Sequence, residues 1–381
     1  MFAKTKILII SFSDLANDPR VNRQIRFLLD NYQITTFGFK SSNIDNVDFF
    51  CIPQEKTNIL QKSYSASRLL LGLYENYYWD KPEMQFIYEK VLDLDIDLIL
   101  VNDIDPLPVA IKLAKEKNIK IIFDAHEYAP REWEESIRFR LFFQKFISYL
   151  CNSYIPQVNA MMTVCQAIAD TYENDTNVKP IVITNAPDYE NLNPKLLTNN
   201  NKIKLIHHGG SSPSRRIDKM IRMMGYLDEH FELNFLLIGG KSRYNNYLKQ
   251  ISQEYSNINF LEPVPMRELP GFLNKFDIGI YILEPSNFNN LYALPNKLFE
   301  FIQARLAIAI GPSPEMARIV RDYDLGVIAE DFEPKTLAEK IMALDYQKIN
   351  YYKQQSHQAA YELSAERNKQ ILLDLVQTTL T

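Results

Sequence analysis

Two kinds of segment alternate along the chain. Short apolar runs, which predict buried strands, are separated by longer stretches with apolar residues at helical spacing. This alternation is typical of parallel α/β folding. In the first half it predicts strands over residues 6–11, 34–39, 98–101, 119–123, 161–164 and 181–184, with helices between them, for example over 18–30, 107–117 and 139–151.

The same pattern restarts in the second half, and between the halves residues 185–201 read as a linker. This stretch holds two prolines and six asparagines and shows little apolar periodicity. We therefore expect one Rossmann-like domain over residues 1–190, a second over 200–360, and a C-terminal helix over 361–381. Strands of the second half are predicted over 203–208, 234–238, 258–261, 278–282, 307–310 and 326–328.

Length and composition fit a folded protein with two domains. The chain has 381 residues, of which 46% are hydrophobic and 23% charged. Its formal charge of −5 disfavours general binding of nucleic acid but allows a local basic cleft. The three cysteines lack metal-binding spacing, and their odd number suits a reducing compartment. Because the first apolar run is too short for a signal peptide or membrane helix, we expect a cytoplasmic protein.

Residues 294–301 carry the most informative chemistry. Pro295 suits the first position of a helix, where no backbone donor is lost. Asn296 and Lys297 then lie at the positive end of that helix, which can hold an anion. Glu300 follows one turn later on the same face and can accept hydrogen bonds from hydroxyls. Together these residues predict a nucleoside-diphosphate ligand, and an ordinary amphipathic helix is the alternative.

A second candidate for phosphate binding follows the first strand of the second half. Gly209 and Gly210 allow a ligand to approach the backbone closely. Arg215 and Arg216 come shortly before a helix predicted from residue 217, and the planar fork of arginine suits phosphate. A solvated loop with two surface arginines is the alternative. Lys241 lies in the turn after the next predicted strand, where an exposed structural lysine is one interpretation.

Residues 294–301 resemble the donor-binding motif of retaining glycosyltransferases of family 4, which have the two-domain glycosyltransferase-B (GT-B) fold. The resemblance implies an α/β protein with two Rossmann-like, doubly wound domains facing across a cleft, the last helix packing back on the first domain. It assigns ribose binding to Glu300. Many members carry a second glutamate eight residues earlier, where this chain has Tyr292, and Gly210 replaces an arginine of the family's Gly-Arg pair. These departures leave the identity of the sugar open.

The activity implied is transfer of a hexose from a nucleoside-diphosphate sugar to an acceptor hydroxyl with retention, without a metal ion or other cofactor. Arg215 and Lys297 would stabilise the leaving diphosphate. The loop around Val264 would line the nucleobase, and the turn at residues 289–292 would place backbone amides near the phosphate and sugar. The implied donor-binding residues are Gly209, Gly210, Arg215, Lys241, Val264, Asn290, Leu291, Tyr292, Asn296, Lys297 and Glu300.

His126 is the best candidate for chemistry in the first domain. It ends a predicted strand, and residues 124–127 are similar to a family segment beside the donor sugar. The resemblance implies that His126 donates to a sugar hydroxyl or to a developing charge. A histidine satisfied by the local backbone is the alternative.

The acceptor side is assigned to Asp18, Arg20 and Asp103. Asp18 predicts a helix cap, and Arg20 would touch the acceptor or, in the alternative interpretation, cover apolar packing at the surface. Asp103 and Asp105 form an Asp-x-Asp string, which holds a metal in the other main glycosyltransferase fold. We place Asp103 in a loop near the cleft and predict no metal site.

Two other functions remain open from the sequence. One is a nucleotide-sugar 2-epimerase of the same fold, and the other is a non-catalytic relative that binds nucleotide or a protein partner. For the transferase, we expect a saccharide or lipid-linked acceptor in the synthesis of cell-surface polysaccharide or glycoconjugate, and no nucleic-acid partner. Residues 138–154 combine aromatic and basic side chains, which fits peripheral contact with the inner membrane face or, alternatively, a buried helix.

Overall fold

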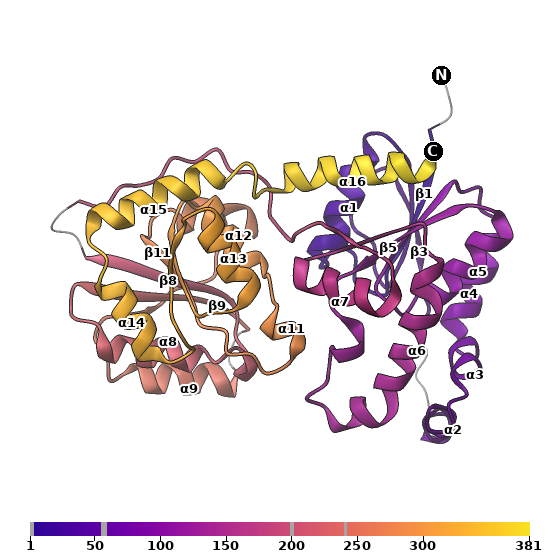
Figure 1. The fold of residues 1–381 in the computed structure, drawn as a ribbon, viewed down its shortest axis with the longest axis horizontal. Helices are drawn as coiled ribbons and strands as arrows, with labels where there is room; N and C mark the ends of the chain where they lie inside the picture. Colours follow the sequence, from indigo (N-terminus) through magenta and orange to yellow (C-terminus); the bar gives the residue numbers. More distant parts are fainter. Residues whose placement is uncertain (1–3, 55–58, 199–201, 240–241) are drawn as a thin grey trace. The chain divides into compact units, whose positions relative to one another are not determined.

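The computed structural model describes residues 4–54, 59–198, 202–239 and 242–381, and the chain divides into two compact units (Figure 1). Unit 1 comprises residues 1–184, 287–289 and 368–381, and unit 2 comprises residues 185–286 and 290–367. The end of the chain therefore belongs to the same unit as its beginning.

Unit 1 is built on a parallel sheet of seven strands in the order β3-β2-β1-β4-β5-β6-β7. All six strands predicted in the first half are confirmed. The prediction missed β3, an edge strand without a fully buried side chain, because such a strand needs no apolar run. The strands are β1 (Lys6–Ile10), β2 (Gln33–Gly38), β3 (Val47–Cys51), β4 (Leu98–Asn102), β5 (Lys120–Ala125), β6 (Ala160–Thr163) and β7 (Ile181–Val182).

Helix α1 (Pro19–Leu29) begins as predicted. Oδ1 of Asp18 accepts hydrogen bonds from the backbone N–H groups of Arg20 and Val21 at 3.2 and 3.1 Å. The end of α1 is tied to the last helix, α16 (Ala365–Leu380), because Nζ of Lys369 donates to Asp30 at 2.9 Å. The other helices are α2 (Ile59–Leu70), α3 (Tyr74–Trp79), α4 (Pro82–Leu92), α5 (Leu107–Lys117), α6 (Gln144–Tyr154) and α7 (Gln166–Thr176).

The segment with aromatic and basic character folds as a π-helical turn, Phe139–Phe143, that continues into α6. Phe146, Ile147 and Leu150 of α6 are buried, which confirms the buried-helix interpretation for this face. Leu141 on the preceding turn is 63% exposed. Within the described ranges, no helix is both long and apolar enough to cross a membrane.

Unit 2 repeats this architecture with six parallel strands in the order β10-β9-β8-β11-β12-β13. All the strands predicted in the second half are confirmed. In both sheets the strand order runs outward in two directions from a central strand, which makes both of them doubly wound. The strands are β8 (Ile203–Gly210), β9 (Phe231–Ile238), β10 (Ile258–Phe260), β11 (Ile278–Tyr281), β12 (Ala307–Ile310) and β13 (Gly326–Ile328).

Helix α12 (Asn296–Gln303) packs closely on β11. A Cβ atom at Gly279 of β11 would lie 2.4 Å from the ring of Phe301, so only glycine lets α12 approach this far. This packing places the start of α12 beside the end of the sheet. The other helices of unit 2 are α8 (Ile217–Met223), α9 (Arg243–Ser252), α10 (Leu269–Leu273), α13 (Pro314–Asp322), α14 (Pro334–Met342) and α15 (Tyr346–Ala359), and α11 (Phe288–Leu291) spans the boundary between the units.

Candidate functional site

Two cationic side chains converge on bare backbone at the end of β8. Gly209 has a φ angle of +111°, a conformation that side chains rarely adopt. A Cβ atom built there would lie 3.5 Å from Cε of Lys297 and 3.8 Å from Nη1 of Arg215. The two cationic side chains therefore lie beside a stretch of main chain that carries no side chain of its own.

A fixed hydrogen-bond chain holds Lys297. Its side chain is buried, and Nζ lies 3.1 Å from Nε2 of His207. Nδ1 of His207 lies 3.1 Å from the carbonyl oxygen of Ile280, which can only accept, so Nδ1 carries the proton and Nε2 accepts from Lys297. The ammonium also lies 3.9 Å from the ring centroid of Tyr281, where a cation–π contact forms.

Electrostatics at this place favour an anionic ligand. Burial and the charge of Arg215 hold the pKa of Lys297 well below its usual value, against the opposing effect of Glu300. Burial and Lys297 likewise hold the pKa of His207 well below its usual value, so this ring stays neutral. A bound phosphate would relieve the repulsion between the two cations and favour the charged form of Lys297.

Glu300 lies one turn beyond Lys297, and both side chains are buried. Oε2 of Glu300 is 3.4 Å from Nε2 of His208, whose ring packs edge-on against Phe301 at 5.2 Å. Burial and the charge of Lys297 lower the pKa of His208 to about 3. The imidazole is therefore neutral, and it lies beside the carboxylate without cancelling its charge.

Helix α12 begins one residue later than predicted. Pro295 is the N-cap, with extended backbone, and Asn296 is the first helical residue. The amphipathic-helix alternative is also correct as a description of packing, because Leu298 and Phe299 are buried. The polar residues of this helix are thus presented from a helix whose apolar side is fixed in the core.

Arg215 and Arg216 separate in the structure. Arg216 has a left-handed φ of 45° and directs its guanidinium to Glu284, at 3.1 Å, and Asp218, at 3.3 Å. Arg215 is the arginine that reaches Gly209. The sequence could not distinguish the two, because the difference arises from one backbone conformation.

The remaining donor-binding candidates of unit 2 lie near ends of strands and helices. A Cβ atom at Gly210 would meet no other atom within 4 Å, so the space beside it is open. Val264 is half-buried in the loop after β10, next to a cavity of about 480 Å³ that Phe260, Glu262 and Pro263 help to line. Lys241 lies outside the described residues. Asn290, Leu291, Tyr292 and Asn296 are half-buried at or just before the start of α12.

His126 in unit 1 is held among polar side chains. Its Nε2 lies 3.0 Å from Oδ1 of Asn102 and 3.3 Å from Oδ2 of Asp124, and its Nδ1 lies 3.5 Å from Oδ2 of Asp103. Burial alone would lower the pKa of His126, but the carboxylates of Asp103 and Asp124 outweigh it and raise the pKa to about 9. His126 is therefore an imidazolium at neutral pH, and its ring partners are side chains, so the local-backbone alternative is wrong.

Arg20 joins the same network from α1. Its Nε and Nη2 donate to the two carboxylate oxygens of Asp124 at 2.6 and 2.7 Å, and Nη1 donates to the carbonyl of Ile183 at 2.7 Å. Burial would raise the pKa of Asp124, yet Arg20 and His126 hold it well below its usual range. Arg20 is only 7% exposed, so the surface-arginine interpretation is wrong.

A cavity of about 260 Å³ adjoins His126. Asp103, with a left-handed φ of 63°, lines it together with Asp105, Glu127 and Glu132. Burial and then Asp103 raise the pKa of Glu127 to about 7, and burial and then Glu127 raise the pKa of Glu132 to about 8. In the described part of the chain, no group of three or more His, Cys, Asp or Glu side chains is arranged to hold a metal ion.

Two doubly wound parallel sheets of this kind match solved structures of the GT-B class of fold. The family model described as glycosyl transferases group 1 matches residues 188–360, which is most of unit 2. No curated protein matches the sequence significantly.

Solved structures resemble the chain over nearly its whole length. HepE from Anabaena in complex with UDP has a TM-score of 0.72 at 13% identity, covering 98% of this chain and 100% of that one. A glycosyltransferase from Rickettsia africae has a TM-score of 0.70 at 14% identity, covering all of both chains. Sucrose-phosphate synthase from Thermosynechococcus elongatus has a TM-score of 0.72 at 11% identity, covering 98% and 99%. The solved structures show the GT-B fold, and the family model over residues 188–360 supports a glycosyltransferase.

Sequence reasoning missed three residues that contact Lys297 or Glu300, namely His207, His208 and Tyr281. A usable signal existed, because two histidines interrupt the end of an apolar strand directly before two glycines. Tyr281 gave no signal, since an aromatic residue at the end of a strand is ordinary.

Proposed function

We propose that this chain is a retaining glycosyltransferase of family 4 type, which moves a sugar from a nucleoside-diphosphate donor to an acceptor hydroxyl. The observation that carries the proposal is the convergence of Lys297 and Arg215 on the backbone of Gly209. The family model over unit 2 and the UDP bound to HepE, a protein of the same fold, support it.

The two cations act on the leaving group. In the reaction the bond between the sugar C1 and the diphosphate oxygen breaks, and C1 bonds to the acceptor oxygen on the same face. The acceptor proton passes to the leaving phosphate. Negative charge builds on the phosphate oxygens as the bond breaks, so cations fixed beforehand by the fold stabilise the transition state more than the ground state.

Other residues bind the remaining parts of the donor. Glu300 accepts hydrogen bonds from the ribose hydroxyls, and the neutral ring of His208 lies beside its carboxylate. The cavity next to Val264 takes the nucleobase. His126 donates a hydrogen bond to a hydroxyl of the donor sugar, as an imidazolium fixed by its carboxylate neighbours.

We also propose that the reaction needs no metal ion, because Lys297, Arg215 and the start of α12 supply positive charge at the diphosphate. The acceptor is a saccharide or lipid-linked saccharide of a cell-surface polysaccharide or glycoconjugate. Peripheral contact with a membrane remains a prediction.

The proposal is tested by incubating the protein with UDP-, GDP- and ADP-linked hexoses and measuring release of nucleoside diphosphate, with and without saccharide acceptors. A transferase releases the diphosphate and forms a glycosylated product. A non-catalytic nucleotide-binding protein shifts in thermal stability with the nucleotide but releases nothing. An epimerase changes the configuration of the sugar at C2, which proton NMR of the recovered donor detects.

A further inference from the structure

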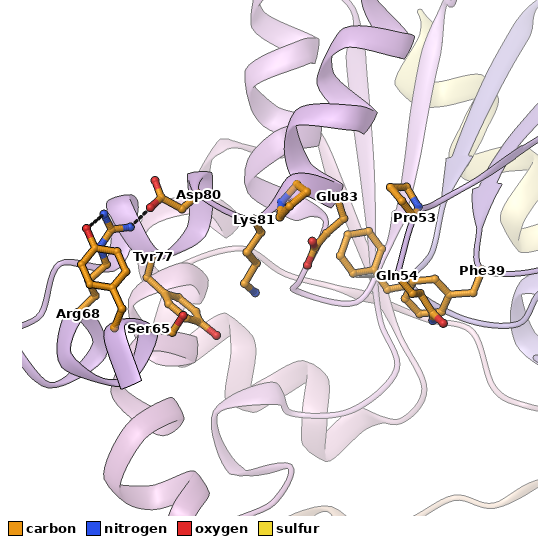
Figure 2. Close-up of a pocket in the computed structure, with 12 residues that line it drawn as sticks. Phe39, Pro53, Gln54, Ser65, Arg68, Tyr77, Asp80, Lys81 and Glu83 are labelled. Carbon is orange, nitrogen blue, oxygen red and sulfur yellow. Dashed lines mark hydrogen bonds and ion pairs between the residues drawn. The ribbon is translucent and has the colours of Figure 1, made fainter. Parts of the chain in front are cut away.

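Unit 1 contains a second, larger cavity that none of the site residues predicted from the sequence lines. Its volume is about 710 Å³, and Figure 2 shows its walls. Phe12 follows β1, Phe39 follows β2, and Pro53 and Gln54 follow β3, so one wall is the carboxyl end of three parallel strands. In doubly wound sheets this edge is where ligands bind. The opposite wall comes from α2, α3 and the start of α4.

Aromatic rings that pack against neighbouring side chains line both walls of the cavity. The rings of Phe12 and Phe39 lie 5.9 Å apart. Tyr77 packs edge-on against Phe146 at 4.9 Å, and the guanidinium of Arg68 lies 4.2 Å from the ring centroid of Tyr64. Because neighbouring side chains restrain these rings, a ligand that packs on them loses little further side-chain entropy.

The cavity is lined by four charged side chains. Arg68 and Asp80 form an ion pair, whereas Lys81 and Glu83 are available to hydrogen bond a ligand. Arg68 binds Asp80 and the hydroxyl of Tyr64. Figure 2 shows the ammonium of Lys81 and the carboxylate of Glu83 projecting into the cavity. Among the described residues, neither of these two side chains has an ion pair or a hydrogen bond, and Lys81 only approaches aromatic rings, Tyr77 at 4.9 Å.

An uncharged sugar fits this combination. A sugar ring has apolar C–H faces that pack on aromatic rings and a rim of hydroxyls that both donate and accept. Lys81 donates only and the carboxylate of Glu83 accepts only, so adjacent hydroxyls satisfy both. The charges that line the cavity cancel, Arg68 with Asp80 and Lys81 with Glu83, so no net positive charge favours an anionic ligand. The volume lies within the range of about 300–1,000 Å³ that is usual for small-molecule sites.

We propose that this cavity binds an uncharged saccharide unit of the acceptor, with Lys81 and Glu83 determining specificity by hydrogen bonding its hydroxyls. The assignment to the acceptor rests on the proposed function. The binding of an uncharged sugar rests on unit 1 alone.

The test uses saturation-transfer NMR on the full chain with saturating UDP. The probes are the methyl glycosides of glucose, galactose, mannose and N-acetylglucosamine, and glucose 6-phosphate is the anionic comparison. At least one methyl glycoside should bind through its ring C–H protons. Lys81→Met and Glu83→Gln should each weaken that binding by about tenfold or more, since each removes hydrogen bonds to a charged group.

Two control variants match these changes outside the cavity. Lys112→Met removes another lysine stacked over aromatic rings, 4.0 Å from the ring centroid of Tyr88, and Glu89→Gln changes an exposed carboxylate on α4 itself. Both controls should bind the glycoside as the wild type does. All four variants should bind UDP unchanged, because the nucleotide site lies in unit 2.

Three results would overturn the proposal: no methyl glycoside binds, Lys81→Met and Glu83→Gln bind it normally, or only glucose 6-phosphate binds. Donor turnover by the wild type is measured in parallel. If turnover is present while the glycosides fail, this inference is wrong and the proposed function stands. If a glycoside binds as expected but no donor is turned over, the cavity is a sugar site and its assignment to an acceptor is wrong.

Discussion

Nζ of Lys297 lies 3.1 Å from Nε2 of His207, and this contact has a defined direction. The carbonyl oxygen of Ile280 accepts a hydrogen bond from Nδ1–H of His207. Nε2 therefore carries a lone pair, which accepts from the lysine. His207 thereby fixes the lysine beside Gly209 without adding a charge. It is a positioning residue, and its contribution depends on one acceptor atom.

This relationship predicts different outcomes for two substitutions of His207. In His207→Gln the amide oxygen can still accept from Lys297, whereas His207→Phe fills similar space without an acceptor. We expect His207→Phe to lower kcat by about 10- to 100-fold through misplacement of the cation, and His207→Gln to keep most of the activity. Diphosphate release and urea unfolding are measured together for both variants. Equal losses of kcat in the two, or no loss in either, would rule out positioning through this atom.

Glu300→Ala should weaken nucleotide binding. Removing the ribose hydrogen bonds of a carboxylate costs about 1.5–3 kcal/mol. Calorimetry measures the affinities of wild type and variant for UDP and for 2′-deoxy-UDP, which together form a thermodynamic cycle. The wild type should bind UDP more tightly than the deoxy analogue, and the variant should lose this preference. Glu339→Ala, an exposed glutamate on α14, is the control. Unchanged affinity in a folded Glu300→Ala protein would reject the ribose role.

His126 should make unit 1 less stable at alkaline pH. Its folded pKa of about 9 lies above the ordinary value of 6.5. The stabilisation from its charged form is therefore fully present below pH 6.5 and lost as pH rises through 9, an effect on the order of 3 kcal/mol. Urea unfolding of wild type and His126→Asn should differ more at pH 6 than at pH 10. A difference that does not change with pH would contradict the charged state assigned to His126.

Chelation should leave turnover essentially intact. Lys297, Arg215 and the N-terminus of α12 are proposed to stabilise the negative charge of the diphosphate. EDTA therefore removes no group that the reaction uses. The check is the rate of diphosphate release before and after dialysis against EDTA. Loss of activity that manganese or magnesium restores would contradict this prediction and would indicate that Asp103 and Asp105 bind a metal ion.

The accuracy of the sequence-based predictions depended on how local each feature is. Strands that are buried on both faces appear in the sequence as apolar runs, so they were predicted. The placement of Lys297 and Glu300 on one face of a helix was predicted from their spacing of three residues. Contacts across the sheets were not predictable. His207 and Lys297 are 90 residues apart, and Arg20 and Asp124 are 104 apart, so both pairs depend on strand order.

The cavity after β1, β2 and β3 was missed for the same reason. Its wall combines residues after three separate strands with residues from helices, and no single stretch of sequence shows that combination. Arg20 is a further example. We predicted it on the acceptor side, and the structure shows that its guanidinium donates to the buried carboxylate of Asp124 on β5, a pairing that no local pattern of the sequence indicates.

Lys297→Ala removes one of the two cations that stabilise the leaving diphosphate in the proposed reaction, so its effect should appear in kcat. Steady-state donor turnover should show kcat reduced by about 10²–10³-fold, as for other preorganised charge stabilisers, while Lys335→Ala, an exposed lysine on α14, behaves as wild type. Arg215→Ala should change kcat in the same direction, and the double variant should lose less than the sum because both cations serve one phosphate. A Lys297→Ala enzyme with normal kcat and only a raised KM would show that the lysine binds the donor equally in ground and transition states, which contradicts the account.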